Sequence, residues 1–152
     1  MKIIIAGAGA VGTHLAKLLS REKQDIILID DNEERMSTLS SNFDLMTVNA
    51  SPTSIKGLKE VGAGEADLFH LPFTPDESRN ITACMLATNL GAVKTVGRID
   101  NYEYLLPKNK EFFPEVRSRF AYLPGNACGK RDCIFYPYEL GTPMVGIFAG
   151  AH

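Results

Sequence analysis

The chain has no tryptophan, three cysteines, no long apolar run and no excess of positive charge. Its 16 Lys and Arg residues against 18 Asp and Glu give a net charge of -2, which leaves no basic stripe for a nucleic acid partner. No stretch approaches the roughly 18 apolar residues that a membrane-spanning helix needs. These features are typical of a soluble domain with a real core, and we expect the chain to be cytoplasmic.

The three cysteines do not have the spacing of a disulfide framework or a zinc site, which fits a reducing compartment. Cys84 falls inside a helical pattern and is predicted to be a small core residue rather than a nucleophile. The histidines also lack a partner at metal-binding spacing. We therefore predict no metal ligands and no catalytic residues.

Glycine is concentrated directly after the first apolar run. Lys2–Ala6 is rich in isoleucine without polar alternation, which predicts a central strand buried on both faces. The spacing G-x-G-x-x-G follows and opens a helical pattern; its glycines permit a tight turn, the approach of a pyrophosphate, and close helix packing. A turn with no ligand is the alternative interpretation. The predicted phosphate-binding turn consists of Gly7, Ala8, Gly9, Ala10, Val11 and Gly12.

A second apolar run, Ile26–Ile29, ends in Asp30, 18 residues beyond Gly12. A dinucleotide-binding fold places there the carboxylate that accepts hydrogen bonds from the adenosine ribose. Asp31 follows, so a 2′-phosphate would meet two negative charges, and NAD(H) is favoured over NADP(H). An adenine mononucleotide stays open, because the carboxylate contacts only the ribose. Asp31 is also the predicted N-cap of the next helix.

Downstream, apolar runs continue to alternate with helical patterns. This order predicts an α/β fold: a Rossmann-like doubly wound parallel sheet with helices on both faces, five strands evident and the sixth missing. After the first helix and second strand, we expect strands near 44–48, 66–69 and 94–99, and helices near 31–41, 53–61, 74–90 and 101–113, the last interrupted by Pro107.

The carboxyl ends of parallel strands form the ligand edge of such a sheet. Asn49, Ala50 and Ser51 follow the third strand and can touch the adenosine, although a plain turn fits equally well. Thr74 is the predicted cap of the helix after the fourth strand and can face the phosphates or the nicotinamide. Arg98 can clamp a pyrophosphate, pair with an acid of a neighbouring subunit, or form a surface ion pair.

Together these residues resemble the N-terminal nucleotide-binding half of the Trk potassium-uptake regulatory proteins, the RCK or TrkA-N domain. The likeness covers Met1 to about Phe113 and rests on the segments IIIAGAGAVGTHLAKLL, ILIDDNEER, VNASPTS, TPDESRNITACMLATNLGA and GRIDNYEYL. It implies a non-enzymatic protein peripheral to the inner membrane that binds NAD(H), or ATP and ADP as some relatives do. It also implies a homo-oligomer, dimer or tetramer, that gates a membrane potassium transporter.

The resemblance assigns the glycine turn to the phosphates and Asp30 to the ribose. It places Ala50 and Ser51 by the adenosine, and Thr74 and Arg98 on the diphosphate side. Asn49 stands where the family usually has an aspartate, which puts one adenosine contact in question.

Two segments depart from the family pattern. The family reads DLFIAVT, whereas this chain has DLFHLPFT, and Pro72 cannot donate to a central ladder. From Pro114 the sequence is rich in turn-formers and without periodicity. We therefore divide the chain into a Rossmann domain, 1–113, and a non-family tail, 114–152, expected to be irregular or disordered.

A shift of one base in the tail would permit QKSGVDSLIYPEMLAAKEIV, the expected family continuation with its sixth strand. Our hypothesis is that an inserted base put the tail out of frame, and that smaller insertions made His70 to Phe73. Resequencing the gene tests this, and a clean read with the present frame would exclude it.

An alternative function is a fragment of an NAD-dependent dehydrogenase that lacks its substrate domain. The ligand edge offers no convincing general base for it: Asp76 and Glu77 are predicted to cap a helix, and His70 lies in the atypical insert. A third alternative is a truncated Rossmann module with no function of its own.

Overall fold

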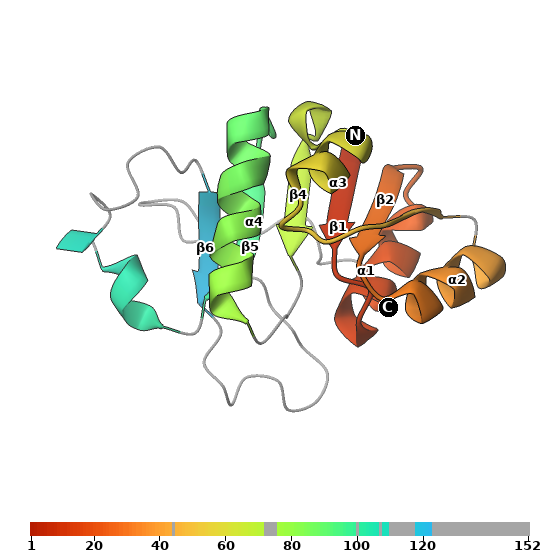
Figure 1. Cartoon of the computed structure of the whole chain (residues 1–152), viewed down its shortest axis with the longest axis horizontal. Coiled ribbons are helices and arrows are strands. Elements are labelled where there is room, and N and C mark those ends of the chain that lie inside the picture. The colour runs from red at the N-terminus through yellow and green to blue at the C-terminus, as the bar shows by residue number, and fades with distance from the viewer. Residues whose placement is uncertain (44, 72–75, 100, 107, 110–117, 123–152) are drawn as a thin grey trace.

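The alternation of strands and helices is the main feature of the computed structural model (Figure 1). The structure describes residues 1–43, 45–71, 76–99, 101–106, 108–109 and 118–122. In chain order the elements are β1 Lys2–Ala6, α1 Ala10–Ser20, β2 Asp25–Asp30, α2 Glu33–Asn42, β3 Met46–Asn49, α3 Ile55–Glu60, η1 Ala63–Glu65, β4 Leu68–Leu71, α4 Glu77–Leu90, β5 Thr95–Ile99, η2 Tyr102–Leu105 and β6 Ser118–Tyr122.

The strands of the described residues form one parallel sheet in the order β3-β2-β1-β4-β5-β6. β1 lies at the centre, between β2 and β4. Strands β2 and β3 are added on one side of β1, and strands β4 to β6 on the other. All carboxyl ends therefore meet at one edge, and the crevice beside β1 is the topological switch point where ligands of such sheets bind.

The side chains of β1 alternate between two apolar cores. Ile3 and Ile5 join a cluster with residues of α1 and α2, whereas Ile4 and Ala6 join a cluster with residues of α3 and α4. The sheet is therefore covered on both faces, and the predicted doubly wound fold is confirmed.

The structure corrects two predicted helix starts. The N-cap of α2 is Asn32, whose side chain accepts from the Arg35 N–H at 2.9 Å, and not Asp31. The N-cap of α4 is Asp76 and not Thr74; Asp76, which was also predicted to have a capping role, accepts from the Arg79 N–H at 3.0 Å. A cap must reach the N–H groups of the first turn, and in each case a residue nearer the helix does so. Thr74 itself lies outside the described residues.

The third strand is shifted from the predicted 44–48 to Met46–Asn49. Its position is set by the register with β2, in which Asn49 is opposite Asp30. Gly91 ends α4, as predicted. Of the predicted helix at 101–113, the structure describes a short 3₁₀ turn at Tyr102–Leu105, which Asn101 caps through its contact with the Glu103 N–H.

The expectation of a missing sixth strand was wrong. Ser118–Tyr122, within the segment assigned to the irregular tail, pairs with β5 along its whole length. An edge strand presents unpaired N–H and C=O groups, so an extended segment can pair there whatever its origin. The two aromatic residues of SRFAY are types enriched in strands. The hypothesis of a shifted frame stays a prediction, and residues 123–152 lie outside the described part.

The side chains of Cys84 and His70 are buried in the core. Cys84 on α4 is fully buried, and burial raises the pKa of its thiol to about 12, so it packs as the predicted small core residue. His70 lies near the end of β4, where the sequence placed it, and burial lowers its pKa to about 4. The strand ends at Leu71, the residue before Pro72.

None of the helices in the described ranges combines the length and the apolar character needed to cross a bilayer.

Candidate functional site

The glycine turn joins β1 to α1 at the carboxyl edge of the sheet. Gly7 has φ of 121°, a left-handed conformation that glycine adopts readily, and its N–H donates to the Ile29 carbonyl at 2.8 Å. Gly9 is the N-cap of α1 and makes no side-chain cap bond. A Cβ at Gly9 would meet no atom of the described residues within 4 Å, so among these residues the space in front of this helix end is open. Open N–H groups at a helix N-terminus favour an anion.

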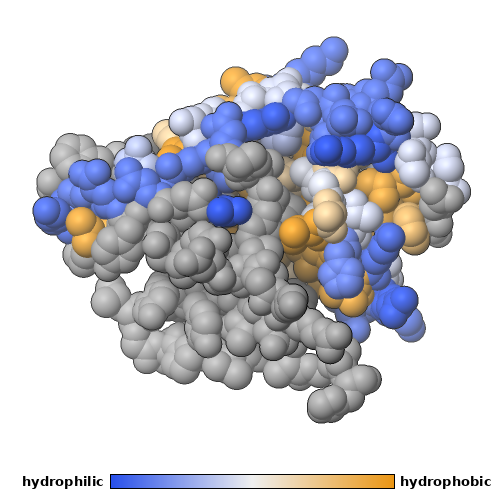
Figure 2. Space-filling model, turned by 90° about the horizontal axis from the view of Figure 1, so that it is seen from below, coloured by the Kyte–Doolittle hydropathy of each residue, from blue (hydrophilic) through white to orange (hydrophobic). Residues whose placement is uncertain are grey.

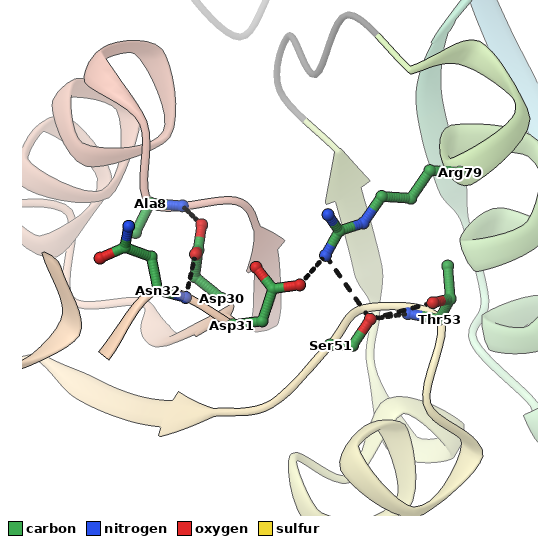
Figure 3. A network of polar contacts seen from close by, with 7 residues as sticks. All are labelled: Ala8, Asp30, Asp31, Asn32, Ser51, Thr53 and Arg79. Carbon is green, nitrogen blue, oxygen red and sulfur yellow. Dashed lines mark hydrogen bonds and ion pairs between the residues drawn. The ribbon is translucent and has the colours of Figure 1, made fainter. Parts of the chain in front are cut away.

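Asp30 lies beside this turn at the end of β2 (Figure 3). Its Oδ2 accepts from the Ala8 N–H at 2.6 Å, and its Oδ1 accepts from the Asn32 N–H at 2.8 Å. The side chain is therefore fixed between the glycine turn and the start of α2, and the residue is only 8% exposed. Each carboxylate oxygen can accept more than one hydrogen bond, so a sugar hydroxyl can still bind here.

A cleft of about 770 Å³ runs from the glycine turn between α1 and α2. Of the described side chains that line it, His14, Lys17 and Arg35 are basic types and Glu34 is acidic. Lys17 lies 4.2 Å from the centre of the Phe43 ring, a cation–π contact. The residues that line the cleft are Ala8, Gly9, Ala10, Thr13, His14, Lys17, Asn32, Glu34, Arg35, Thr38 and Leu39.

Figure 2 shows the molecule from the side towards which β1 points in Figure 1, where hydrophilic and hydrophobic residues lie side by side. Both kinds of residue are therefore exposed on this side of the described part of the chain.

A polar network links three elements at this edge (Figure 3). Arg79, in the first turn of α4, forms an ion pair with Asp31, the residue after β2. The same nitrogen, Nη2, lies 3.5 Å from Oγ of Ser51 in the turn after β3. Ser51 in turn hydrogen-bonds Oγ1 of Thr53 at 2.9 Å. The network spans the sheet edge from β2 to α4 across the switch point.

The predicted adenosine residues are brought to Asp30 by the backbone. Asn49 is opposite Asp30 in the sheet, and the Ala50 N–H donates to the Asp30 carbonyl at 3.0 Å. α3 packs directly on this turn, since a Cβ at Gly57 would lie 2.7 Å from that of Ala50. Asn49, Ala50 and Ser51 thus share the edge with Asp30; their contact with a nucleotide stays a prediction.

Arg98 occupies the fourth position of β5, at the same edge of the sheet. Its carbonyl accepts from Nδ2 of Asn80 at 3.0 Å, and Asn80 is fully buried on α4. This bond ties the first turns of α4 to the end of β5. That the Arg98 guanidinium binds a diphosphate stays a prediction.

Our sequence interpretation missed Arg79. A signal was present: a cation in the first turn of a helix is electrostatically unfavourable, so its position called for a nearby acid. That acid is Asp31, 48 residues earlier in the chain. Among the described residues, no group of three or more His, Cys, Asp or Glu side chains is arranged to hold a metal ion.

Comparison with known proteins gives the site a family context. Residues 3–113 match the model of the TrkA-N domain. The Trk system potassium uptake protein TrkA of Haemophilus influenzae is 43% identical over 113 residues, which are 74% of this chain and 24% of that protein. The chain thus spans about a quarter of the length of this relative.

Solved structures show the same fold. The TrkA-N domain of the inner membrane protein ybaL from Escherichia coli superposes with a TM-score of 0.67 at 14% identity, covering 82% of this chain and 87% of that one. The GsuK channel bound to NAD superposes with a TM-score of 0.63 at 16% identity, covering 81% of this chain and 21% of the channel chain. With the family match over residues 3–113, these findings establish that the chain belongs to the TrkA-N domain family.

Proposed function

We propose that this chain is an NAD(H)-binding regulatory subunit of a potassium uptake system. It acts in the cytoplasm, at the periphery of the inner membrane, and gates a membrane potassium transporter as part of a homo-oligomer. The membership of the TrkA-N family and the 43% identity to a Trk system potassium uptake protein support this role.

The observation that carries the proposal is the position of Asp30. Its carboxylate is fixed by the Ala8 N–H at 2.6 Å, directly beside the open end of α1 at Gly9. A diphosphate at that helix end places the adenosine ribose next to the carboxylate, as a dinucleotide-binding fold requires. ATP and ADP carry the same ribose and a diphosphate, so they compete with NAD(H) for this site.

Binding becomes regulation if the nucleotide has different affinities for two conformations. The ligand then shifts the population towards the conformation it prefers, and the assembly transmits this bias to the transporter. We therefore expect NADH and NAD to differ in affinity or in conformational effect.

Calorimetry on the full chain with NADH, NAD, ATP and ADP tests the proposal, with Asp30→Asn as the key variant. Removing the charge weakens the bonds to the ribose, and we expect at least about a tenfold loss of NADH affinity. Asp25→Asn is the matched control, because Asp25 is exposed at the other end of β2. If the wild-type chain binds none of the four nucleotides, the proposal is wrong.

We propose no enzymatic role. His70 comes closest to a general base by sequence, but it is only 6% exposed within β4, and its pKa of about 4 makes it a weak proton acceptor at pH 7. A dehydrogenase fragment would instead show hydride transfer from NADH to small carbonyl compounds, which an absorbance assay at the NADH band detects.

A further inference from the structure

Asp30, the last residue of β2, and Asp31 are consecutive carboxylates at the carboxyl edge of the sheet, and their surroundings differ. Asp30 is buried and bound by two backbone N–H groups. The side chain of Asp31 is 50% exposed and pairs with Arg79. A second negative charge is therefore present, but it is compensated by a cation from α4. The formal charge of Asp30, Asp31 and Arg79 together is -1, and not the -2 that the two acids alone suggest.

The Arg79 guanidinium also has N–H donors that these contacts do not use. Its ion pair with Asp31 and its approach to Ser51 at 3.5 Å both use Nη2, among the contacts of the described residues. A guanidinium carries five N–H donors in a rigid fork that suits phosphate oxygens. The side chain is 32% exposed, so a ligand can reach it. Figure 3 shows it extending from α4 towards the residue that follows Asp30.

We infer that Arg79 determines how this site treats the ribose 2′ position: it supplies the positive charge that admits a 2′-phosphate beside Asp31. The inference rests on the proposed function, since it concerns the adenosine end of the proposed nucleotide site. In dinucleotide-binding folds the acid at the end of the second strand binds the ribose 2′-hydroxyl, and an arginine nearby accommodates a 2′-phosphate. Arg79 pairs with the residue that directly follows this acid. The balance between Asp31 and Arg79 then sets the ratio of the two affinities.

The test is a set of titrations on the full chain with NADH and NADPH, repeated with 5′-AMP and adenosine 2′,5′-bisphosphate, which isolate the 2′-phosphate. Arg79→Gln should weaken NADPH binding at least about fivefold more than NADH binding, because both acids then face the phosphate. Asp31→Asn should strengthen NADPH binding relative to NADH, since it frees the guanidinium. Arg79→Lys keeps the positive charge, so its ratio of NADPH to NADH affinity should lie between those of wild type and Arg79→Gln.

Two controls separate a local effect from a general loss of charge. Arg21→Gln removes an exposed cation at the far end of α1, and Asp25→Asn removes an exposed acid at the far end of β2; neither should change the ratio. Circular dichroism of each variant checks that the fold is intact. In the double variant Asp31→Asn/Arg79→Gln, the two effects should not add, because the residues act as a pair.

The outcomes are distinct. If NADH binds but the ratio of NADPH to NADH affinity is the same in wild type, Arg79→Gln and Asp31→Asn, the inference is overturned while the proposed function stands. The same holds if wild type does not bind NADPH, or if Arg79→Gln weakens both ligands by one factor. If wild type binds no nucleotide, both fall together.

Discussion

Single residues decide whether the end of α1 can receive a phosphate, and Gly9 is the clearest case. Its φ of -68° is ordinary for any residue, so the backbone conformation does not demand glycine. Nor does packing, since a Cβ there would touch no atom of the described residues within 4 Å. The absent side chain leaves space outside the protein, where a pyrophosphate would approach the N–H groups.

Gly9→Ala separates these effects. We expect the free energy of unfolding to change by less than about 0.5 kcal/mol, because the new methyl group meets no neighbour. NADH affinity should fall at least about tenfold, because the methyl group lies in the path of the diphosphate. Urea unfolding and calorimetry on the same preparation measure both. Unchanged affinity would show that the helix end does not bind the phosphates.

At the scale of elements, α4 connects the core to the candidate site. Its buried face packs Ala83, Cys84 and Ala87 against the sheet, while its first turn presents Arg79 to Asp31. Its other end is fixed by close backbone contact with η1: a Cβ at Gly64 would lie 2.4 Å from the Leu90 carbonyl oxygen. The position of Arg79 therefore depends on packing at both ends of this helix.

Gly64→Ala should destabilise the fold by about 1–3 kcal/mol, because a carbonyl in the last turn of α4 cannot move away as a flexible side chain can. Thermal unfolding gives the change, and Gly9→Ala serves as the matched substitution without a neighbour. A variant as stable as wild type would mean that η1 and α4 can separate without cost. Because the clash is remote from the carboxyl edge, nucleotide affinity should change less than stability.

At the scale of the whole molecule, the buried imidazole of His70 links stability to pH. The sheet holds it neutral, with a pKa near 4 against 6.5 in the unfolded chain. As pH falls below 6.5, the unfolded state takes up a proton and the folded state does not. Above pH 6.5, the titration of His70 does not change the free energy of unfolding. As pH falls from 6.5 to about 4, it lowers the free energy of unfolding progressively, by about 3 kcal/mol in total.

His70→Gln removes this titration, so the loss of stability between pH 6.5 and 4 should be about 3 kcal/mol smaller than in wild type. Urea unfolding across this pH range measures the free energy of unfolding of both proteins. Carboxyl groups that titrate in the same range contribute equally to both, so their contribution cancels in the difference. Parallel profiles for wild type and His70→Gln would refute the assignment.

Local chemistry was enough to predict much of the fold. β1 matched its predicted bounds, and α1 follows the glycine turn, because an isoleucine run and a glycine spacing are encoded by neighbouring residues. Boundaries were less accurate where two residues competed for one task. The N-cap of α2 is Asn32 and not Asp31, and the N-cap of α4 is Asp76 and not Thr74. An N-cap side chain must lie close enough to accept from the N–H groups of the first turn, and the residue nearer the helix does so.

The sequence by itself determined the α/β class, the parallel sheet and the placing of Asp30 at the end of β2 after a glycine turn, because each is encoded by the types and the spacing of residues that are neighbours in the chain. Only the tertiary structure decided which charges meet at the carboxyl edge. Asp31 and Arg79 are 48 residues apart, and β6 is paired to β5 by residues that carry no family signal. Such pairings follow from the folding of the sheet, which brings strand ends together regardless of their separation in the chain.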